Sequence, residues 1–209
     1  MVKVTGPMMS MDASGSLGGA VVFSKWKGRN YVRTLVKPAN PRSALQVSMR
    51  AMFGFLAQQW AGFSPTEQAS WEALAEQLVA SPFDAYMKTN QTRWRNGLYP
   101  TKDSSFPTTA GVGTVGALTA TGGIRQITLA QLMTAVADNW GLAIYRSPTA
   151  VFTPSLSNCV KIIRVNDPDT AGAWVDTPLV PGDYWYETIP FDWSGVAGTP
   201  SAEATGTVT

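Results

Sequence analysis

The chain has 209 residues, of which 44% are hydrophobic and 14% are charged, and its formal net charge is +2. This composition is typical of a folded protein, since disordered chains combine low hydrophobicity with high net charge. Histidine is absent and Cys159 is the single cysteine, which excludes an intrachain disulfide and removes the usual general base and metal ligand. No apolar run is long enough for a signal peptide or a membrane span, so we expect a chain made in a cytoplasm.

Charge is distributed unevenly along the chain. Residues 1–105 hold twelve Lys and Arg against six Asp and Glu, whereas residues 106–209 hold four against eight. The change falls in a stretch rich in Ser, Thr, Pro and Gly, which predicts a linker at residues 103–116. We therefore expect an α+β protein of two modules: an extended arm (1–19), a hairpin with helices (20–102), the linker, and a β-sandwich (117–209).

A β-hairpin is expected at the start of the first module. Residues 20–26 and 29–36 are β-prone, and Lys27-Gly28 between them suits a two-residue turn. An isolated two-stranded hairpin is marginally stable in water. We expect this one to pack on the helices or on a neighbouring subunit.

Three helix starts share an Asn/Ser-Pro sequence. The first is Asn40-Pro41, with Asn40 as N-cap, and Gly62 ends this helix. The second is Ser64-Pro-Thr-Glu67, which has the form of a capping box. The third is Ser81-Pro82, with Asn96-Gly97 as its stop.

Apolar residues recur along these segments at the spacing of one helix face. The first helix is expected to bury Leu45, Met49, Met52, Phe53, Leu56 and Trp60. The second is expected to bury Trp71, Leu74, Ala75 and Leu78, and the third Phe83, Tyr86, Met87 and Trp94. Trp60, Trp71 and Trp94 are therefore interpreted as core residues and not as a ligand site.

The second module changes to short β-prone runs separated by turn residues, which favours a sandwich. The expected strands are 123–129, 140–147, 159–165, 184–189 and 202–209. Residues 129–136 are interpreted as a strand continuation or a short turn.

No residue set that could carry catalysis, bind a cofactor or bind a metal is found, so we expect the protein not to be an enzyme. Asp167 and Asp169 flank Pro168 in what reads as a turn, because a calcium site needs six or more oxygens. Cys159 lies in an apolar run with no histidine to activate it, so we expect it to be buried. The glycines at 15–19 do not open a helix or precede Lys-Ser/Thr, which argues against a phosphate loop.

The strongest candidate for a functional site is a basic segment with interleaved aromatic residues. No acidic residue lies between Asp12 and Glu67. The candidate interface residues are Lys25, Trp26, Lys27, Arg29, Tyr31, Arg33, Lys37, Arg42 and Arg50. Strand alternation is expected to place Lys25, Lys27, Arg29 and Arg33 on one face. Such a patch could bind an acidic surface of a protein, bind nucleic acid, or be merely solvated.

Residues 19–100 resemble a family of small proteins encoded among bacteriophage virion genes. The shared pattern comprises Gly18-Gly19 before Val22-Phe23, Tyr31-Val-Arg33, Pro38-x-Asn40-Pro41, Gln46, Arg50, Trp60, Ser64-Pro-Thr-Glu-Gln-Ala-Ser-Trp71, Phe83-x-x-Tyr86 and Asn90. The resemblance implies a component of a phage particle.

The second module resembles a fibronectin type III or immunoglobulin-like domain. The matching residues are Trp140 to Arg146 as a central strand, Leu179 to Tyr186 as the corner before the penultimate strand, and Gly195 with Ser201 before the last. The position usual for the corner tyrosine holds Trp185, so the resemblance assigns that role to either Tyr184 or Tyr186.

Together these interpretations predict a structural component of a bacteriophage virion, present as a homo-oligomer or in many copies. Its N-terminal module is expected to anchor it to capsid, portal, neck or tail subunits, with a neck, collar or capsid-decorating position preferred. One alternative is a nucleic-acid-binding accessory protein that uses residues 25–50. Another is a carbohydrate-binding module that uses aromatic residues of the sandwich such as Trp174, Trp185 or Trp193.

Overall fold

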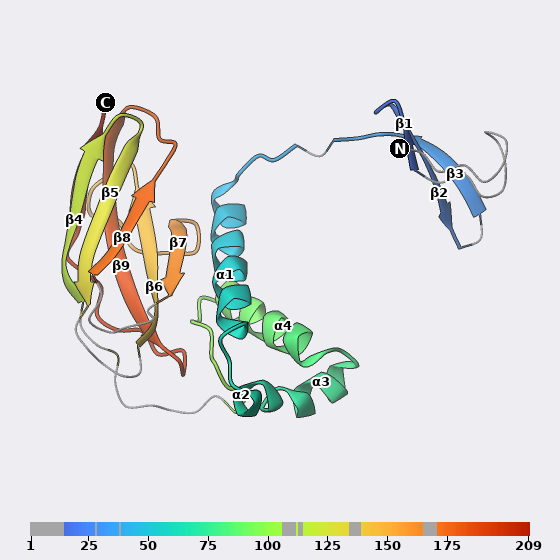
Figure 1. The fold of residues 1–209 in the computed structure, drawn as a ribbon. Helices are drawn as coiled ribbons and strands as arrows, with labels where there is room; N and C mark the ends of the chain where they lie inside the picture. Colours follow the sequence, from blue (N-terminus) through green and yellow to red (C-terminus); the bar gives the residue numbers. More distant parts are fainter. Residues whose placement is uncertain are drawn as a thin grey trace. The chain divides into compact units, whose positions relative to one another are not determined.

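The computed structural model describes residues 15–209 except 28, 38, 106–111, 113, 114, 134–138 and 165–170. The chain divides into two compact units, residues 1–41 and residues 42–209 (Figure 1). Each unit is described by itself below.

The first unit is a three-stranded antiparallel sheet with the order β1-β2-β3. Its strands are β1 (Gly15–Leu17), β2 (Val21–Trp26) and β3 (Arg29–Thr34). The pairing of Trp26 with Arg29 across the turn confirms the predicted hairpin. The predicted arm differs, because residues 15–17 pair with β2 and residues 1–14 lie outside the described part of the chain.

The second unit begins with four helices in the described residues. They are α1 (Ala44–Trp60), α2 (Pro65–Ala69), α3 (Glu72–Leu78) and α4 (Pro82–Arg95). Two predicted starts are confirmed: Ser64 forms a capping box with Glu67, and the Ser81 hydroxyl accepts a hydrogen bond from the Asp84 amide. The predicted stop is also confirmed, since Asn96 caps α4 and Gly97 takes a φ of 76°.

Two helix predictions were wrong. The first helix starts at Ala44 with Ser43 as N-cap, and not at Pro41 after Asn40, because Arg42 adopts a left-handed φ of 48° that a helix cannot include. The second predicted helix is two short helices, α2 and α3. They are separated at Ser70, whose hydroxyl donates to the Glu67 carbonyl and thereby competes with the helical backbone pattern.

The rest of the second unit is a β-sandwich. Its strands are β4 (Val115–Gly123), β5 (Gln126–Met133), β6 (Asn139–Ser147), β7 (Cys159–Arg164), β8 (Ala171–Asp176), β9 (Gly182–Asp192) and β10 (Ala204–Val208). One antiparallel sheet has the order β4-β5-β8 and the other has the order β10-β9-β6-β7. The chain passes from one sheet to the other between β5 and β6, between β7 and β8, and between β8 and β9. Two facing antiparallel sheets with this strand order form a fibronectin type III or immunoglobulin-like sandwich.

Most of the predicted strands are present. Residues 126–133 are one strand, so the segment from Leu129 continues a strand as far as Met133, and the remainder to 136 is outside the described residues. The sequence interpretation missed β8 and most of β4. Both belong to the three-stranded sheet, where residues of β8 pair with residues of β5 that lie 39 to 49 positions earlier in the sequence.

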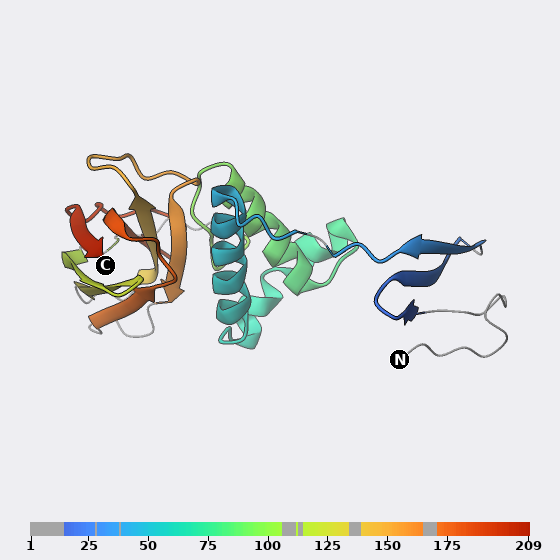
Figure 2. The same ribbon diagram turned by 90° about the horizontal axis from the view of Figure 1, so that it is seen from above.

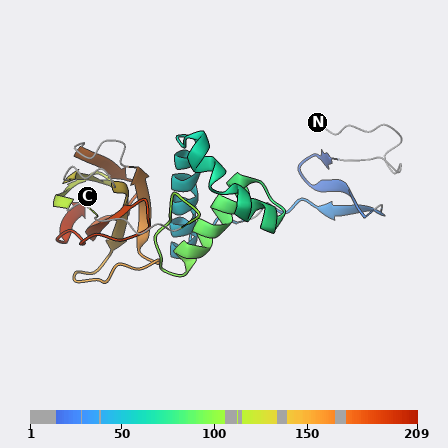
Figure 3. The ribbon, with the colours of Figure 1, turned by 90° about the horizontal axis from the view of Figure 1, so that it is seen from below.

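The helices pack directly on the four-stranded sheet, and both share one hydrophobic core. Phe55 of α1 lies with its ring centroid 5.2 Å from that of Trp140 and 5.4 Å from that of Phe191. Figures 2 and 3 show α1 beside this sheet from two sides. The predicted separation into a helical module and a sandwich is therefore not confirmed, and most of the predicted linker lies outside the described residues.

Strand β6 explains why the two parts form one body. Leu142 and Ile144 face the interior of the sandwich, whereas Ala143 and Tyr145 face the helices, and all four are at most 4% exposed. Gly141 lies under the Phe191 ring so closely that a Cβ atom there would be 2.3 Å from it. The sheet is thus buried on both faces, which requires a continuous apolar run and not an alternating one.

Candidate functional site

The register of the N-terminal sheet decides which candidate residues share a face. Residues paired across an antiparallel ladder point to the same side. Arg29 pairs with Trp26, Tyr31 with Ser24 and Arg33 with Val22. One face therefore carries two arginines and two aromatic rings, and we call it the aromatic–basic face: Trp26, Arg29, Tyr31 and Arg33.

The expectation that Lys25 shares this face was wrong. Lys25 pairs with Asn30, one position out of phase with Arg29, so it lies on the opposite face. That face also carries Val21 and Phe23, which are half-buried, and Val32, which is 58% exposed. The sheet thus has one apolar face and one aromatic–basic face.

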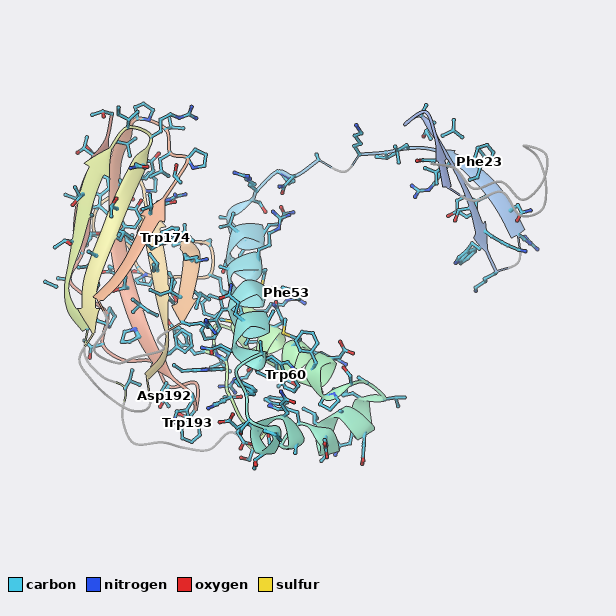
Figure 4. All side chains as sticks on the ribbon, in the orientation of Figure 1. Phe23, Phe53, Trp60, Trp174, Asp192 and Trp193 are labelled. Carbon is cyan, nitrogen blue, oxygen red and sulfur yellow. The ribbon has the colours of Figure 1, made fainter. Side chains whose placement is uncertain are left out.

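This sheet has no core of its own among the described residues. No side chain described between residues 15 and 37 is buried, and Trp26 is 66% exposed. Figure 4 shows Phe23 on the sheet. Small sheets need a packed hydrophobic face for independent stability. Most of the described side chains of this sheet are therefore exposed.

The charge of the sheet is of one sign. Residues 15–41 contain five cations and no carboxylate: Lys25, Lys27, Arg29, Arg33 and Lys37. The Lys27 ammonium lies 4.9 Å from the centre of the Trp26 ring, a cation–π contact at the turn. Exposed charges of like sign repel one another, so an acidic partner surface would relieve this repulsion.

Arg42 and Arg50 belong to the second unit and are not part of this sheet. Arg42 is exposed and borders a hollow of the sandwich together with Arg146 and Tyr184. Arg50 is exposed on α1. The candidate interface predicted as one set therefore falls into two groups on different units.

The sandwich corner is fixed by two tyrosines with different partners. The Tyr184 hydroxyl donates to the Val180 carbonyl at 3.1 Å, which is the bond of a tyrosine corner, so Tyr184 takes that role. The Tyr186 hydroxyl donates to Asp176 at 2.9 Å, and Arg146 also binds Asp176. Burial, together with the Asp176 carboxylate, raises the pKa of Tyr186 well above its usual range.

The other residues singled out in the sequence are structural where they are described. Trp71 and Trp94 are at most 2% exposed and Trp60 is half-buried between helices (Figure 4), which confirms their core role. Cys159 is 1% exposed, and burial raises the pKa of its thiol to about 12. Asp167 and Asp169 lie outside the described residues.

The tryptophans considered for glycan binding are all half-buried. Trp174 and Trp193 pack against the two hydrophobic cores, and both are labelled in Figure 4. Trp185 is half-buried on β9. None of the three offers a fully exposed ring to a sugar.

The described residues contain no group of three or more His, Cys, Asp or Glu side chains placed to hold a metal ion. They also contain no helix with the length and hydrophobicity needed to cross a membrane.

One surface was missed by the sequence analysis. A groove between the end of α3 and the start of α4 is lined by Glu72, Ala75, Glu76, Val79, Ala80 and Pro82. Glu72, Glu76 and Val79 follow one another at steps of four and three residues, and all three are exposed. The stripe predicted from the sequence was the apolar one of Trp71, Leu74, Ala75 and Leu78. Examining the polar face of this helix as well as its apolar face would have found it.

No protein-family model matches the chain, and no curated protein matches it. Solved structures resemble only part of it. A Fn3-like protein from Clostridium thermocellum has 17% identity and a TM-score of 0.33, over 48% of this chain and 96% of that one. Fibronectin(III)-like modules of CbhA from the same organism have 12% identity and a TM-score of 0.30, over 46% and 93%.

A β-1,2-glucanase from Parabacteroides distasonis has 17% identity and a TM-score of 0.38 over 48% of this chain. The chain spans only 13% of that enzyme, and 20% of a family 76 glycoside hydrolase from a Bacteroides thetaiotaomicron strain. The fold assignment of the sandwich rests on its strand order.

Proposed function

We propose that this chain is a non-enzymatic structural subunit of a bacteriophage particle, present in several copies. It binds a neighbouring virion protein through its first unit, the sheet of β1, β2 and β3, here called the N-terminal strand unit. The helix–sandwich body is then held on the particle by this contact. A neck, collar or capsid-decorating position fits a subunit of this size. The phage context comes from the resemblance of residues 19–100 to virion proteins.

The observation that carries the proposal is the construction of the strand unit. It consists of three short strands with no buried side chain in its described part, an apolar face and an aromatic–basic face. The second unit, in contrast, has a large buried core. A unit whose described part fully buries no apolar side chain gains stability by docking, which is how an assembly element differs from a self-contained domain.

The body is suited to a passive structural role. Backbone and side-chain bonds tie the helices to the sandwich at several points, including Gln59 Nε2 to the Trp140 carbonyl at 3.2 Å and the Lys102 amide to the Trp193 carbonyl at 2.8 Å. A single packed body of this kind transmits force between its ends without a hinge.

Particle composition tests the proposal. Purified particles are analysed by mass spectrometry from phage that carry the wild-type gene, Arg33→Glu or the charge-matched control Lys88→Glu, which alters an exposed lysine on α4. We expect the wild type and the control in the particle and depletion of Arg33→Glu. Absence of the wild-type chain from purified particles contradicts the proposal.

A second function is favoured by one observation. Trp26 and Tyr31 lie on the same face as Arg29 and Arg33, an arrangement in which bases could stack while the guanidinium groups bind phosphates. Titration of single-stranded DNA at several salt concentrations tests it. Binding that weakens steeply with salt supports a nucleic-acid role, and no binding at low salt excludes it.

A further inference from the structure

The groove at α3 and α4, here called the acidic groove, has an apolar floor between carboxylates. Ala75, Val79, Ala80 and Pro82 provide the apolar atoms, and Glu72 and Glu76 lie one helical turn apart beside them. The groove is open, and its volume is about 440 Å³. A volume of this order accommodates bulky ring systems.

Charge in this part of the chain is of one sign. No Lys or Arg occurs between Arg50 and Lys88, while four carboxylates do: Glu67, Glu72, Glu76 and Asp84. Glu67 binds Lys102. Glu72 and Glu76 are exposed, and neither forms a salt bridge with any residue in the described ranges.

Val79 provides a second, independent indication of a contact surface. It caps α3 in the left-handed conformation, with a φ of 50°, and its side chain is 93% exposed. Glycine is the usual residue at such a position, because a β-branched side chain is strained there. A strained and almost fully exposed valine contributes nothing to the packing of its own unit, and its apolar surface is available to a partner.

We propose that the aromatic–basic face of one copy binds the acidic groove of a neighbouring copy, with Arg29 and Arg33 facing Glu72 and Glu76. Trp26 and Tyr31, which are 66% and 40% exposed, then cover Val79. The inference rests on the proposed function and names the partner of that same strand unit. Opposite charge brings the surfaces together, and the aromatic–apolar contact at the centre supplies binding energy.

We assign the groove to a second copy of the chain because each chain carries both complementary surfaces, the aromatic–basic face on the first unit and the acidic groove on the second. A contact between two different surfaces of identical subunits is heterologous, so it leaves one free surface at each end and continues to further copies. Such contacts close into rings or extend into filaments. A ring suits the neck or collar position proposed above.

Sedimentation velocity of the full chain over a concentration series tests the contact. The wild type is expected to self-associate, and added salt is expected to weaken the association because exposed charges are screened. Arg33→Glu and Glu76→Arg each replace an attraction by a repulsion, and each is expected to weaken association about five- to tenfold. The double variant Arg33→Glu/Glu76→Arg reverses both charges and is expected to restore most of the wild-type association.

Three variants control for unspecific effects. Lys25→Glu changes the same charge on the opposite face of the sheet, and Gln77→Arg adds a cation about 100° around α3 from Glu76. Both are expected to associate like the wild type. Val79→Gly removes the strain at the left-handed position, so it should keep or raise the melting temperature while weakening association.

Failure of the inference and failure of the proposed function give different results. A wild type that stays monomeric at every concentration, or a double variant that is not restored, overturns the contact between copies. Depletion of Arg33→Glu from particles with normal incorporation of Glu76→Arg also overturns it, but leaves the proposed function standing with another virion protein as partner. A third outcome is a wild type that binds single-stranded DNA and does not self-associate. If Arg33→Glu then abolishes DNA binding and Glu76→Arg preserves it, the contact between copies is overturned in favour of a nucleic-acid partner.

Discussion

The hydroxyl groups of Tyr99 and Tyr145 lie 2.8 Å apart, and this hydrogen bond joins the segment after α4 to strand β6 of the sandwich. Both side chains lie in or against the core that the helices share with the four-stranded sheet. Tyr99 also stacks on Phe191, with ring centroids 4.9 Å apart. The pair therefore connects two parts of the chain that the sequence places on either side of a predicted linker.

We expect Tyr99→Phe and Tyr145→Phe each to lower the free energy of unfolding by about 1–2 kcal/mol, because each leaves the partner hydroxyl without its bond in a buried site. The double variant should cost less than the sum of the single variants, since it removes both polar groups. Urea denaturation of the four proteins measures this coupling. Strict additivity would show that the hydroxyl groups do not interact.

The same pair predicts how stability depends on alkaline pH. Burial raises the pKa of Tyr99 to about 12, and burial with the neighbouring Tyr99 raises that of Tyr145 further. In the unfolded chain tyrosine ionises near pH 10. Between about pH 10 and pH 12 the unfolded state thus loses protons that the folded state keeps, so stability is complete below pH 10 and falls as the pH rises.

The measurement is thermal unfolding at a series of alkaline pH values, together with the absorbance of tyrosinate. The melting temperature should fall more steeply with pH for the wild type than for Tyr145→Phe, because the variant has one fewer tyrosine with a raised pKa. An equal slope for both proteins would contradict the assignment of this pH dependence to Tyr145.

Local structure was the part of the fold that could be predicted from the sequence. The caps at Ser64 and Ser81 depend on residues within one helical turn, and both are as predicted. The hairpin likewise depends on a turn at Lys27 and two neighbouring strands. Interactions this short in sequence leave their own pattern in the residues involved.

Long-range packing was the part that could not be predicted from local patterns. Phe55 was not assigned to the core because it lies off the expected stripe, and it is buried only because α1 has the sandwich on a second side. Phe53 was assigned to the core but is 54% exposed. The run from Trp140 to Tyr145 carried a usable signal, since a strand without alternation is buried on both faces.

The candidate site was predictable in composition but not in geometry. The basic and aromatic residues between Lys25 and Arg33 are evident in the sequence. The face that each residue occupies depends on the register, which a two-residue turn sets so that Lys25 pairs with Asn30. A shift of one position moves a side chain to the other face. Counting every second residue from Lys25 across the turn to Arg29 therefore placed Lys25 on the wrong face.

Because the helices and the sandwich share one core, we expect them to unfold together. Phe55→Ala should lower the free energy of unfolding by about 3–5 kcal/mol, since it opens a cavity between Trp140 and Phe191. Phe53→Ala is the matched control on the same helix, where the side chain is half exposed, and should cost far less. Figure 4 shows Phe53 on α1.

Denaturation followed by far-ultraviolet and near-ultraviolet circular dichroism checks the cooperativity. The two signals should change in one coincident transition of the second unit, and Phe55→Ala should shift both by the same amount. Separate transitions, of which only one responds to Phe55→Ala, would show that the helices and the sandwich are independent domains.

The two confirmed serine caps should differ in their contribution to stability. Ser81 begins α4, which carries the buried Tyr86 and Trp94, whereas Ser64 begins α2, which has no buried residue. Ser81→Ala should therefore cost about 1 kcal/mol of unfolding free energy, the usual value for a lost N-cap. Ser64→Ala should cost less, because fraying of α2 disturbs no core packing and the Glu67 contact with Lys102 still restrains it. Chemical denaturation of both variants measures the difference, and an equal or larger loss for Ser64→Ala would mean that α2 supports the core more than its exposure indicates.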